Sequence, residues 1–194
     1  MSVRLVVMMS ADFNGFYLFP KAQGTDTALK EMLQFLKTNS PGRNLQFAYV
    51  EAETSLIPHL TLWENLHIVF GGSSWEESIM ELKEQQHLIN LIKDPSVVAS
   101  AATAWERLTI SLIKATLLQA QHILVDINES IHSPLNVFNF KKILTTISQQ
   151  KNVYIATSNI SLWLDSSHSL VKRKGYEFEI EILALDSAKR PQTA

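Results

Sequence analysis

Short apolar runs alternate with longer amphipathic segments along most of the chain. Two of the runs, Ile123–Ile127 and Val153–Thr157, are apolar at nearly every position, which is typical of strands that are buried on both faces. The segments that precede them, 103–119 and 133–148, repeat their apolar residues at the spacing of an α-helix. Strands separated by helices in this way predict a parallel sheet with helices on both faces.

Turn and capping residues place the other elements. Capping boxes begin two predicted helices, Ser74-Trp75-Glu76-Glu77 in one and Thr103-Ala104-Trp105-Glu106 in the other. We expect one domain over residues 1–185 without an internal repeat, and a flexible polar tail at 186–194. The further predicted strands are Leu5–Met9, Phe16–Phe19, Leu45–Val50, Ser169–Val171 and Glu177–Leu185, and the predicted helices are Thr27–Lys37, about Ser74–Ile92, about Thr103–Gln119 and about Ser133–Ser148.

Composition narrows the possible functions. The chain has 194 residues, of which 46% are hydrophobic and 19% charged, with a formal net charge of −2, so no basic face indicates a nucleic-acid partner. It has no cysteine, which excludes disulfides, thiolate metal sites and cysteine nucleophiles and fits a reducing compartment. No apolar stretch approaches the ~20 residues of a membrane span, so we expect a cytoplasmic protein without direct membrane insertion.

The stretch FPKAQGTDTAL (Phe19–Leu29) lies between a predicted strand and a predicted helix. A phosphate-binding loop of the form G-x-x-x-x-G-K-[ST] occupies this place in strand–loop–helix nucleotide domains. Gly24 matches the second glycine of that pattern, but the lysine position holds Thr25 and the magnesium-ligand position holds Asp26.

Three further stretches complete a family pattern. SLIPHLTLWENL (Ser55–Leu66) resembles the L-F-P-H-L-T-V-x-E-N-L stretch that follows the Q-loop of ABC-type ATPases. Ala102–Ile127 aligns without a gap with the signature-helix-to-Walker-B block of that family, and Asn152–Val171 resembles its strand, H-loop and final strand. The chain therefore resembles the ABC ATPase nucleotide-binding domain over nearly its whole length.

The resemblance implies an α/β, P-loop-NTPase-like fold, with a mainly parallel sheet flanked by helices. It also implies a helical subdomain at about 56–119. The chain is short between Lys37 and Leu45, where the family carries an antiparallel hairpin region, so the antiparallel β part should be reduced.

Most nucleotide-site positions depart from the family, and only the Walker B aspartate, Asp126, is kept. Ile127 replaces the catalytic glutamate, Ser158 the H-loop histidine, and Ser133 the D-loop aspartate. The positions that the resemblance assigns to the degenerate nucleotide site are Gly24, Thr25, Asp26 and Thr27 in the phosphate loop, Ala52 in the Q-loop, Thr103 and Trp105 in the signature, Asp126 and Ile127 in Walker B, and Ser158 in the H-loop.

These departures predict a pseudo-ATPase without catalytic residues or cofactor. Loss of the lysine removes a charge-assisted contact of ~1.5–3 kcal/mol. Asp26 near a phosphate adds ~4 kcal/mol of repulsion at ~4 Å and an effective dielectric near 20. Ile127 cannot polarise a water molecule, and Trp105 puts an indole where the family brings backbone close to a partner's nucleotide. Low residual or partner-dependent ATPase activity stays open.

Simpler roles are expected for several of these residues. Asp26 or Thr27 should cap the following helix, so that a side-chain oxygen takes the amide hydrogen bonds of the lost phosphate. Asp126 should be a carboxylate held by neighbouring amides at a strand end rather than a magnesium ligand. The scattered histidines, among them His122 and His168, make no ligand spacing, so no metal site is predicted.

A partner-binding surface is predicted in the Ser55–Leu66 stretch. In ABC ATPases this region leads into the helical subdomain, whose groove receives a coupling helix from a membrane partner. The candidate contacts are Ile57, His59, Trp63 and Glu64, with burial in the core as the alternative for the apolar ones.

We therefore expect a non-catalytic structural or regulatory subunit of a transport or secretion assembly. Its partner would be a membrane permease-like subunit, which would place it at the inner face of the membrane, or an intact ABC-type ATPase. No ATP-dependent homodimer is expected. The alternative is the degenerate half of a composite ATPase site, and an unrelated enzyme that reuses the vacated cleft has no support in the sequence.

Overall fold

The structure is a computed structural model that describes most of the predicted domain. The predicted strand Leu5–Met9, the predicted helix Ser74–Ile92 up to residue 91 and the tail at 186–194 lie outside the described residues. Those described are 15–21, 27–40, 45–51, 56–68, 92–118, 120–127, 134–165, 169–174 and 177–183.

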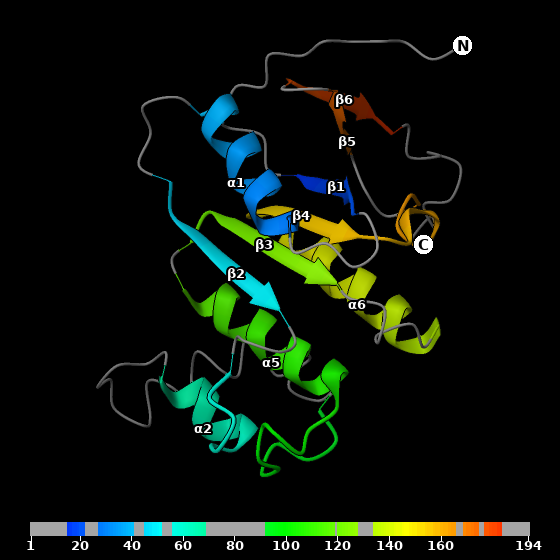
Figure 1. Ribbon diagram of the computed structural model, residues 1–194. Coiled ribbons are helices and arrows are strands. Elements are labelled where there is room, and N and C mark those ends of the chain that lie inside the picture. Colours follow the sequence, from blue (N-terminus) through cyan, green and yellow to red (C-terminus); the bar gives the residue numbers. More distant parts are fainter. Residues whose placement is uncertain are drawn as a thin grey trace, which may run out of the picture.

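A six-stranded sheet in the order β2-β3-β4-β1-β5-β6 forms the centre of the molecule (Figure 1). All neighbouring strands pair in parallel except β5 and β6, which are antiparallel. The strands are β1 (Phe16–Pro20), β2 (Phe47–Glu51), β3 (His122–Ile127), β4 (Asn152–Thr157), β5 (Ser169–Lys174) and β6 (Glu177–Ile182).

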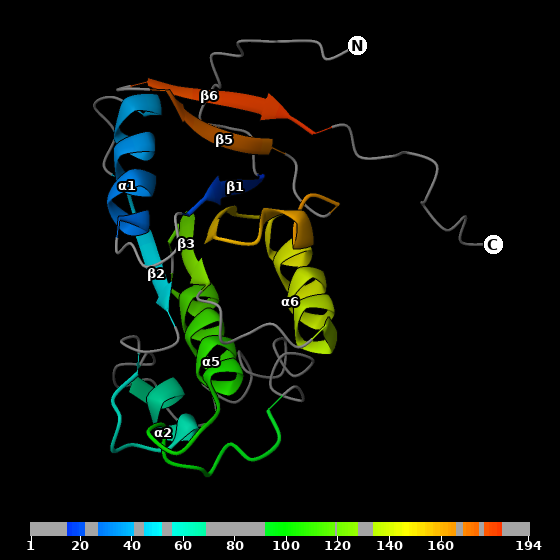
Figure 2. The same cartoon turned by 45° about the vertical axis from the view of Figure 1, so that its right-hand side comes forward.

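Helices cover both faces of the sheet, as predicted. Helix α1 (Ala28–Asn39) lies on one side of the strands, and α5 (Ala104–Leu117) and α6 (Pro134–Ile147) lie on the other (Figure 2). The short α2 (Leu62–His67) packs on α5, and a 3-10 turn, η3 (Ile160–Leu162), follows β4. In the part of the chain that the structure describes, no helix combines the length and apolarity needed to span a membrane.

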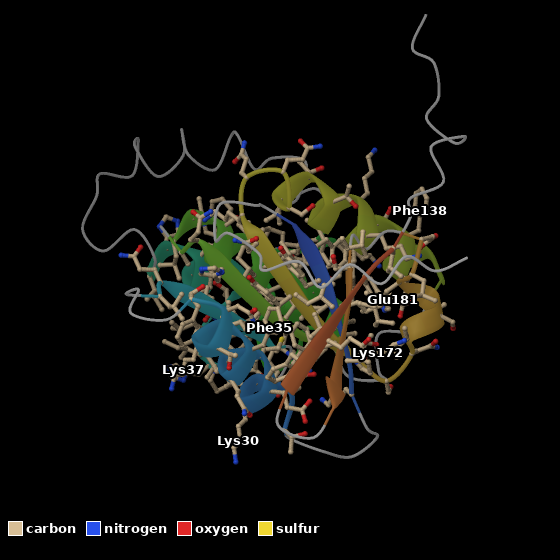
Figure 3. All side chains as sticks on the ribbon, turned by 90° about the horizontal axis from the view of Figure 1, so that it is seen from above. Lys30, Phe35, Lys37, Phe138, Lys172 and Glu181 are labelled. Atoms are coloured by element: carbon tan, nitrogen blue, oxygen red, sulfur yellow. The ribbon has the colours of Figure 1, made fainter. Side chains whose placement is uncertain are left out.

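Alternation along the strands divides the core between the two faces. In β1, Phe16 and Leu18 point to the α5 and α6 side, whereas Tyr17 and Phe19 point to the α1 side. The α1 side is an aromatic layer in which Tyr17 stacks on Tyr154 at 4.9 Å between ring centroids. Figure 3 shows Phe35 of α1 turned into this layer, while Lys30 and Lys37 point away from it. The layer fixes α1 against the strands that carry the candidate site.

Both ends of α1 differ from the prediction, the first in its capping residue and the second in its length. Thr27 has helical backbone angles, φ −87° and ψ −11°, and makes no side-chain capping hydrogen bond, so its predicted capping role is wrong. A cap acts from an extended backbone, which Thr27 lacks, and Asp26, the other predicted cap, lies outside the described residues. At the other end the helix passes Lys37, because Thr38 Oγ1 and Asn39 Nδ2 donate to the carbonyls one turn back.

Candidate functional site

The carboxyl ends of β1, β3 and β4 meet at one edge of the sheet, where the Walker B and H-loop positions lie. The chain leaves β1 through α1 on one face, whereas α5 and α6 connect the other parallel strands on the opposite face. Open α/β sheets bind ligands at such a reversal of strand order. Asp126 lies in β3 at this edge, and Ser158 directly follows β4.

The Asp126 carboxylate forms an ion pair with Lys21. Lys21 Nζ donates to Asp126 Oδ1 at 2.7 Å and to Oδ2 at 3.0 Å. The Tyr49 hydroxyl lies 3.4 Å from Oδ2. The Lys21 side chain is 14% exposed and that of Asp126 is 7% exposed, so the pair is largely withdrawn from solvent. Among the described residues Asp126 is thus held by a lysine and a tyrosine, whereas the sequence predicts neighbouring backbone amides.

Lys21 was missed because it stands at a variable position of the phosphate-loop pattern. It directly follows β1, and its backbone N–H donates to the Thr157 carbonyl at 2.9 Å, which extends the β1–β4 pairing by one step. A cation directly after one parallel strand and a carboxylate near the end of another should meet at the same edge. That signal is present in the sequence, but it requires β1 and β3 to be placed near each other.

Ile127 and Ser158 are the residues that the sequence resemblance assigns to the two positions that act on the attacking water in ABC ATPases. Ile127 is 2% exposed and belongs to the core on the α5 and α6 side. Ser158 is half-buried directly after β4. An isoleucine side chain has no polar atom, and a serine hydroxyl carries no charge, so neither can replace a carboxylate or an imidazolium.

At the start of α5, the residues of the signature position hydrogen-bond to one another. Thr103 has an extended backbone, its hydroxyl accepts from the Glu106 N–H at 3.2 Å, and Glu106 Oε2 accepts from the Thr103 N–H at 3.0 Å. The predicted capping box is confirmed. The Trp105 indole is half-buried and meets the Phe140 ring of α6 edge-on, with centroids 5.2 Å apart.

Among the described residues at this edge, Asp126 is already paired and is not free to bind magnesium. In P-loop ATPases the Walker B aspartate helps to hold magnesium, but here both carboxylate oxygens of Asp126 accept from the Lys21 ammonium. Within the described ranges, no cluster of three or more His, Asp or Glu side chains could hold a metal ion. Gly24, Thr25, Asp26 and Ala52 lie outside the described residues, so their predicted roles stay predictions.

The candidate partner segment is held together by Asn65. This side chain is fully buried, and its Oδ1 accepts from the Ile57 N–H at 2.8 Å. Its Nδ2 donates to the Ile57 and Thr61 carbonyls, each at 3.0 Å. The family-like sequence of this segment therefore has a structural reason, which is the fixed turn before α2.

The four predicted partner contacts divide into two groups. Ile57, His59 and Glu64 are exposed, whereas Trp63 is half-buried against the core and edge-on to the His67 ring. Glu64 also serves as the acceptor of the α2 capping box, and the hydrogen bonds from the Thr61 backbone and then the Thr61 hydroxyl lower its carboxyl pKa.

Backbone hydrogen bonds join this segment to the start of α5. Thr61 forms an antiparallel bridge with Val98, and the Ala99 N–H donates to the Leu60 carbonyl at 2.8 Å. The Ser100 N–H donates to the Pro58 carbonyl at 3.0 Å. Because the turns at 97–102 lead directly into Thr103, the exposed turn at 57–59 and the signature position belong to one hydrogen-bonded unit.

Comparison with known proteins defines the fold. No protein-family model matches the chain, and no curated protein sequence matches it. Solved structures do match. The chain superposes on a dimeric post-hydrolysis state of the ATP-binding cassette MJ0796 bound to ADP and Pi with a TM-score of 0.67, over 90% of this chain and 88% of that one, at 15% identity. The chain has the fold of ABC ATPase domains.

Two further solved structures agree. A putative metal-chelate type ABC transporter in an inward-facing conformation matches with a TM-score of 0.68, 12% identity and coverage of 88% of this chain and 72% of that one. CbiO1 from Clostridium perfringens, part of the ABC transporter complex cbiONQ, matches with a TM-score of 0.62, 11% identity and coverage of 84% and 74%. The ABC ATPase fold predicted from the sequence is thereby confirmed. At sequence identities this low, the matches show the fold and not the function.

Proposed function

We propose that this chain is a non-catalytic ABC-ATPase-like subunit, which serves as a structural or regulatory protein-binding module of a transport or secretion assembly. The observation that carries the proposal is the buried Ile127 directly after Asp126. Hydrolysis requires a group that orients or deprotonates water beside the terminal phosphate. At the position of that group the chain has an alkyl side chain packed into the core.

The remaining polar groups are hydrogen-bonded within the chain, which supports the same proposal. Asp126 is paired with Lys21, and Thr103 and Glu106 cap α5 with each other. The sequence adds Thr25 and Asp26 in the phosphate loop, where a lysine and a hydroxyl would be needed. Each of the residues Ile127, Asp126, Thr103, Thr25 and Asp26 is a replacement, buried or already hydrogen-bonded within the chain.

The exposed turn at Ile57 is the proposed docking surface for a membrane permease-like subunit. Ile57 and Val98 are each 37% exposed, and the turn is rigidly held by Asn65. A rigid surface loses little entropy when it binds. Two of the similar structures are parts of ABC transporters, which supports a permease as the partner and a place at the inner face of the membrane.

A pull-down of the tagged protein from its native host, with charge variants, tests this proposal. Ile57→Glu and His59→Glu should remove a membrane protein or an intact ABC-type ATPase from the eluate, because both side chains are exposed in the turn. Phe138→Glu is the matched control, since Phe138 is 66% exposed but lies on α6. Trp63→Ala is a poorer probe because the half-buried indole packs against the core. A partner that survives both turn variants would exclude this surface.

The alternative function is the degenerate half of a composite ATPase site. Two observations favour it: the Trp105 indole lies against Phe140, and Thr103 at the start of α5 is exposed. A purified complex with an intact ABC-type ATPase would then hydrolyse ATP faster than that ATPase alone, and Thr103→Ala would reduce the gain.

A further inference from the structure

Residues that pair in register on β2, β3, β4 and β1 form one row across the candidate site. The strand register aligns Glu51 of β2 with Asp126 of β3, Asp126 with Ala156 of β4, and Ala156 with Phe19 of β1. Residues paired across parallel strands point to the same face, so this row faces α1. Two carboxyl side chains are therefore neighbours in the row, and a cation beside them would offset their repulsion.

Lys21 is placed to be that cation. It follows Phe19 by two residues and so points to the same face. Its backbone is fixed by the hydrogen bond to Thr157, and its ammonium reaches Asp126 in β3 across β4. The strand between them contributes Ala156 at this level, a small residue that leaves room for the lysine stem. The position of Lys21 is therefore set by both its backbone and its side chain.

The ion pair leaves no place for a divalent cation at Asp126. Magnesium takes near-octahedral oxygen coordination and binds through one or two carboxylates together with substrate phosphates. Here both oxygens of the carboxylate accept from Lys21, at 2.7 and 3.0 Å, and the pair is largely buried. A divalent ion would have to displace a cation that is covalently part of the chain and cannot diffuse away.

We propose that Lys21 is the resident cation of this site, which permanently replaces the divalent ion at Asp126 and closes the edge of the sheet without nucleotide. The inference rests on the proposed non-catalytic function and names the residue that makes the site independent of metal. Lys21 thus stabilises the fold and excludes divalent cations with the same contact.

Manganese is the probe for a test with four proteins: wild type, Lys21→Met, Lys21→Gln and the double variant Lys21→Met/Asp126→Asn. Thermal unfolding is followed with 1 mM MnCl₂ or with NaCl of equal ionic strength, and free manganese is measured by electron paramagnetic resonance. Lys21→Gln keeps a hydrogen-bond donor without the charge, so it gives a readout if Lys21→Met does not fold. The double variant removes both charges and should melt near the wild type.

We expect the wild type to bind no manganese and to melt at the same temperature in both salts. Lys21→Met should melt about 6–20 °C lower, because removal of one partner leaves a buried charge unpaired. Manganese at ten times its dissociation constant should then restore about 3–6 °C in the single variants, and nothing in the double variant.

Three results would overturn the proposal. They are one bound manganese per wild-type chain, a Lys21→Met protein as stable as the wild type, or single variants whose melting temperature does not change with manganese. ATP turnover of the same wild-type preparation is measured in parallel. Turnover would contradict the non-catalytic function whatever manganese does, whereas unresponsive single variants without turnover would remove only the role given to Lys21.

Discussion

The Asn65 side chain binds both backbone polar groups of Ile57: Oδ1 accepts from the Ile57 N–H at 2.8 Å and Nδ2 donates to the Ile57 carbonyl at 3.0 Å. The same Nδ2 also donates to the Thr61 carbonyl at 3.0 Å. One buried amide therefore fixes the whole turn between Ile57 and the start of α2. The exposed residues of that turn keep their positions because of a residue that is itself fully buried.

Replacement of Asn65 by alanine should destabilise the protein by about 2–4 kcal/mol, because buried backbone groups lose their partner. Urea unfolding at neutral pH measures the change. Gln150→Ala is the control, since this amide is exposed and its loss should change stability by less than ~0.5 kcal/mol. Equal stability of Asn65→Ala and the wild type would mean that the turn is not held by this side chain.

The Lys151 side chain should also stabilise the fold. Its ammonium donates to the carbonyls of Thr116, Leu118 and Ala120 at 3.1, 2.8 and 3.0 Å, where α5 ends. Lysine at a helix C-terminus satisfies carbonyls that lack a partner within the helix. Lys151→Met should therefore cost about 1–3 kcal/mol.

Denaturant unfolding of Lys151→Met beside Lys142→Met separates this role from a general effect of lost charge. Lys142 is exposed on α6, so its replacement should stay within ~0.5 kcal/mol of the wild type. Similar losses in both variants would contradict a specific role for Lys151.

His122 should make the protein less stable in mild acid. The ring is buried at the start of β3 with Nδ1 3.2 Å from the Tyr154 hydroxyl, and burial lowers its pKa below the ordinary value. Burial also raises the pKa of Tyr154, so its phenol stays neutral. Below pH ~6.5 the unfolded chain binds a proton that the folded chain refuses, so stability falls as pH falls.

Unfolding free energies of the wild type and His122→Gln between pH 7.5 and 5 test this sign. On acidification the unfolding free energy of the wild type should fall relative to that of His122→Gln, with a limiting slope of ~1.4 kcal/mol per pH unit. Parallel curves would show that His122 takes up its proton equally in both states.

The sequence predicts the fold well and the state of the site only in part. The buried strands β3 and β4 and the helices that precede them, α5 and α6, follow from periodicity, and Thr103 and Glu106 make their capping box through local contacts. The Lys21–Asp126 pair spans 105 residues of sequence. A contact of that range depends on strand order, which periodicity does not give. The short α2 was likewise missed, because six residues are too few for a helical period.

Repair of the phosphate loop should restore binding but not hydrolysis. Thr25→Lys with Asp26→Ser returns the cation and removes the like charge, so weak Mg-ATP binding should appear by calorimetry. Turnover should stay absent, because Ile127 remains buried and Ser158 carries no charge. Phosphate release by the repaired protein would show that water is activated by a residue outside this account.

The most direct test of the non-catalytic function is the melting temperature of the unmodified protein with and without millimolar Mg-ATP, with phosphate release measured on the same sample. A site with a dissociation constant one hundred times below the ligand concentration would stabilise the fold by ~2.7 kcal/mol. That corresponds to a shift of roughly 5–10 °C for a chain of this length. We predict no shift and no phosphate above the buffer blank. A shift of several degrees, or steady phosphate release, would contradict the account.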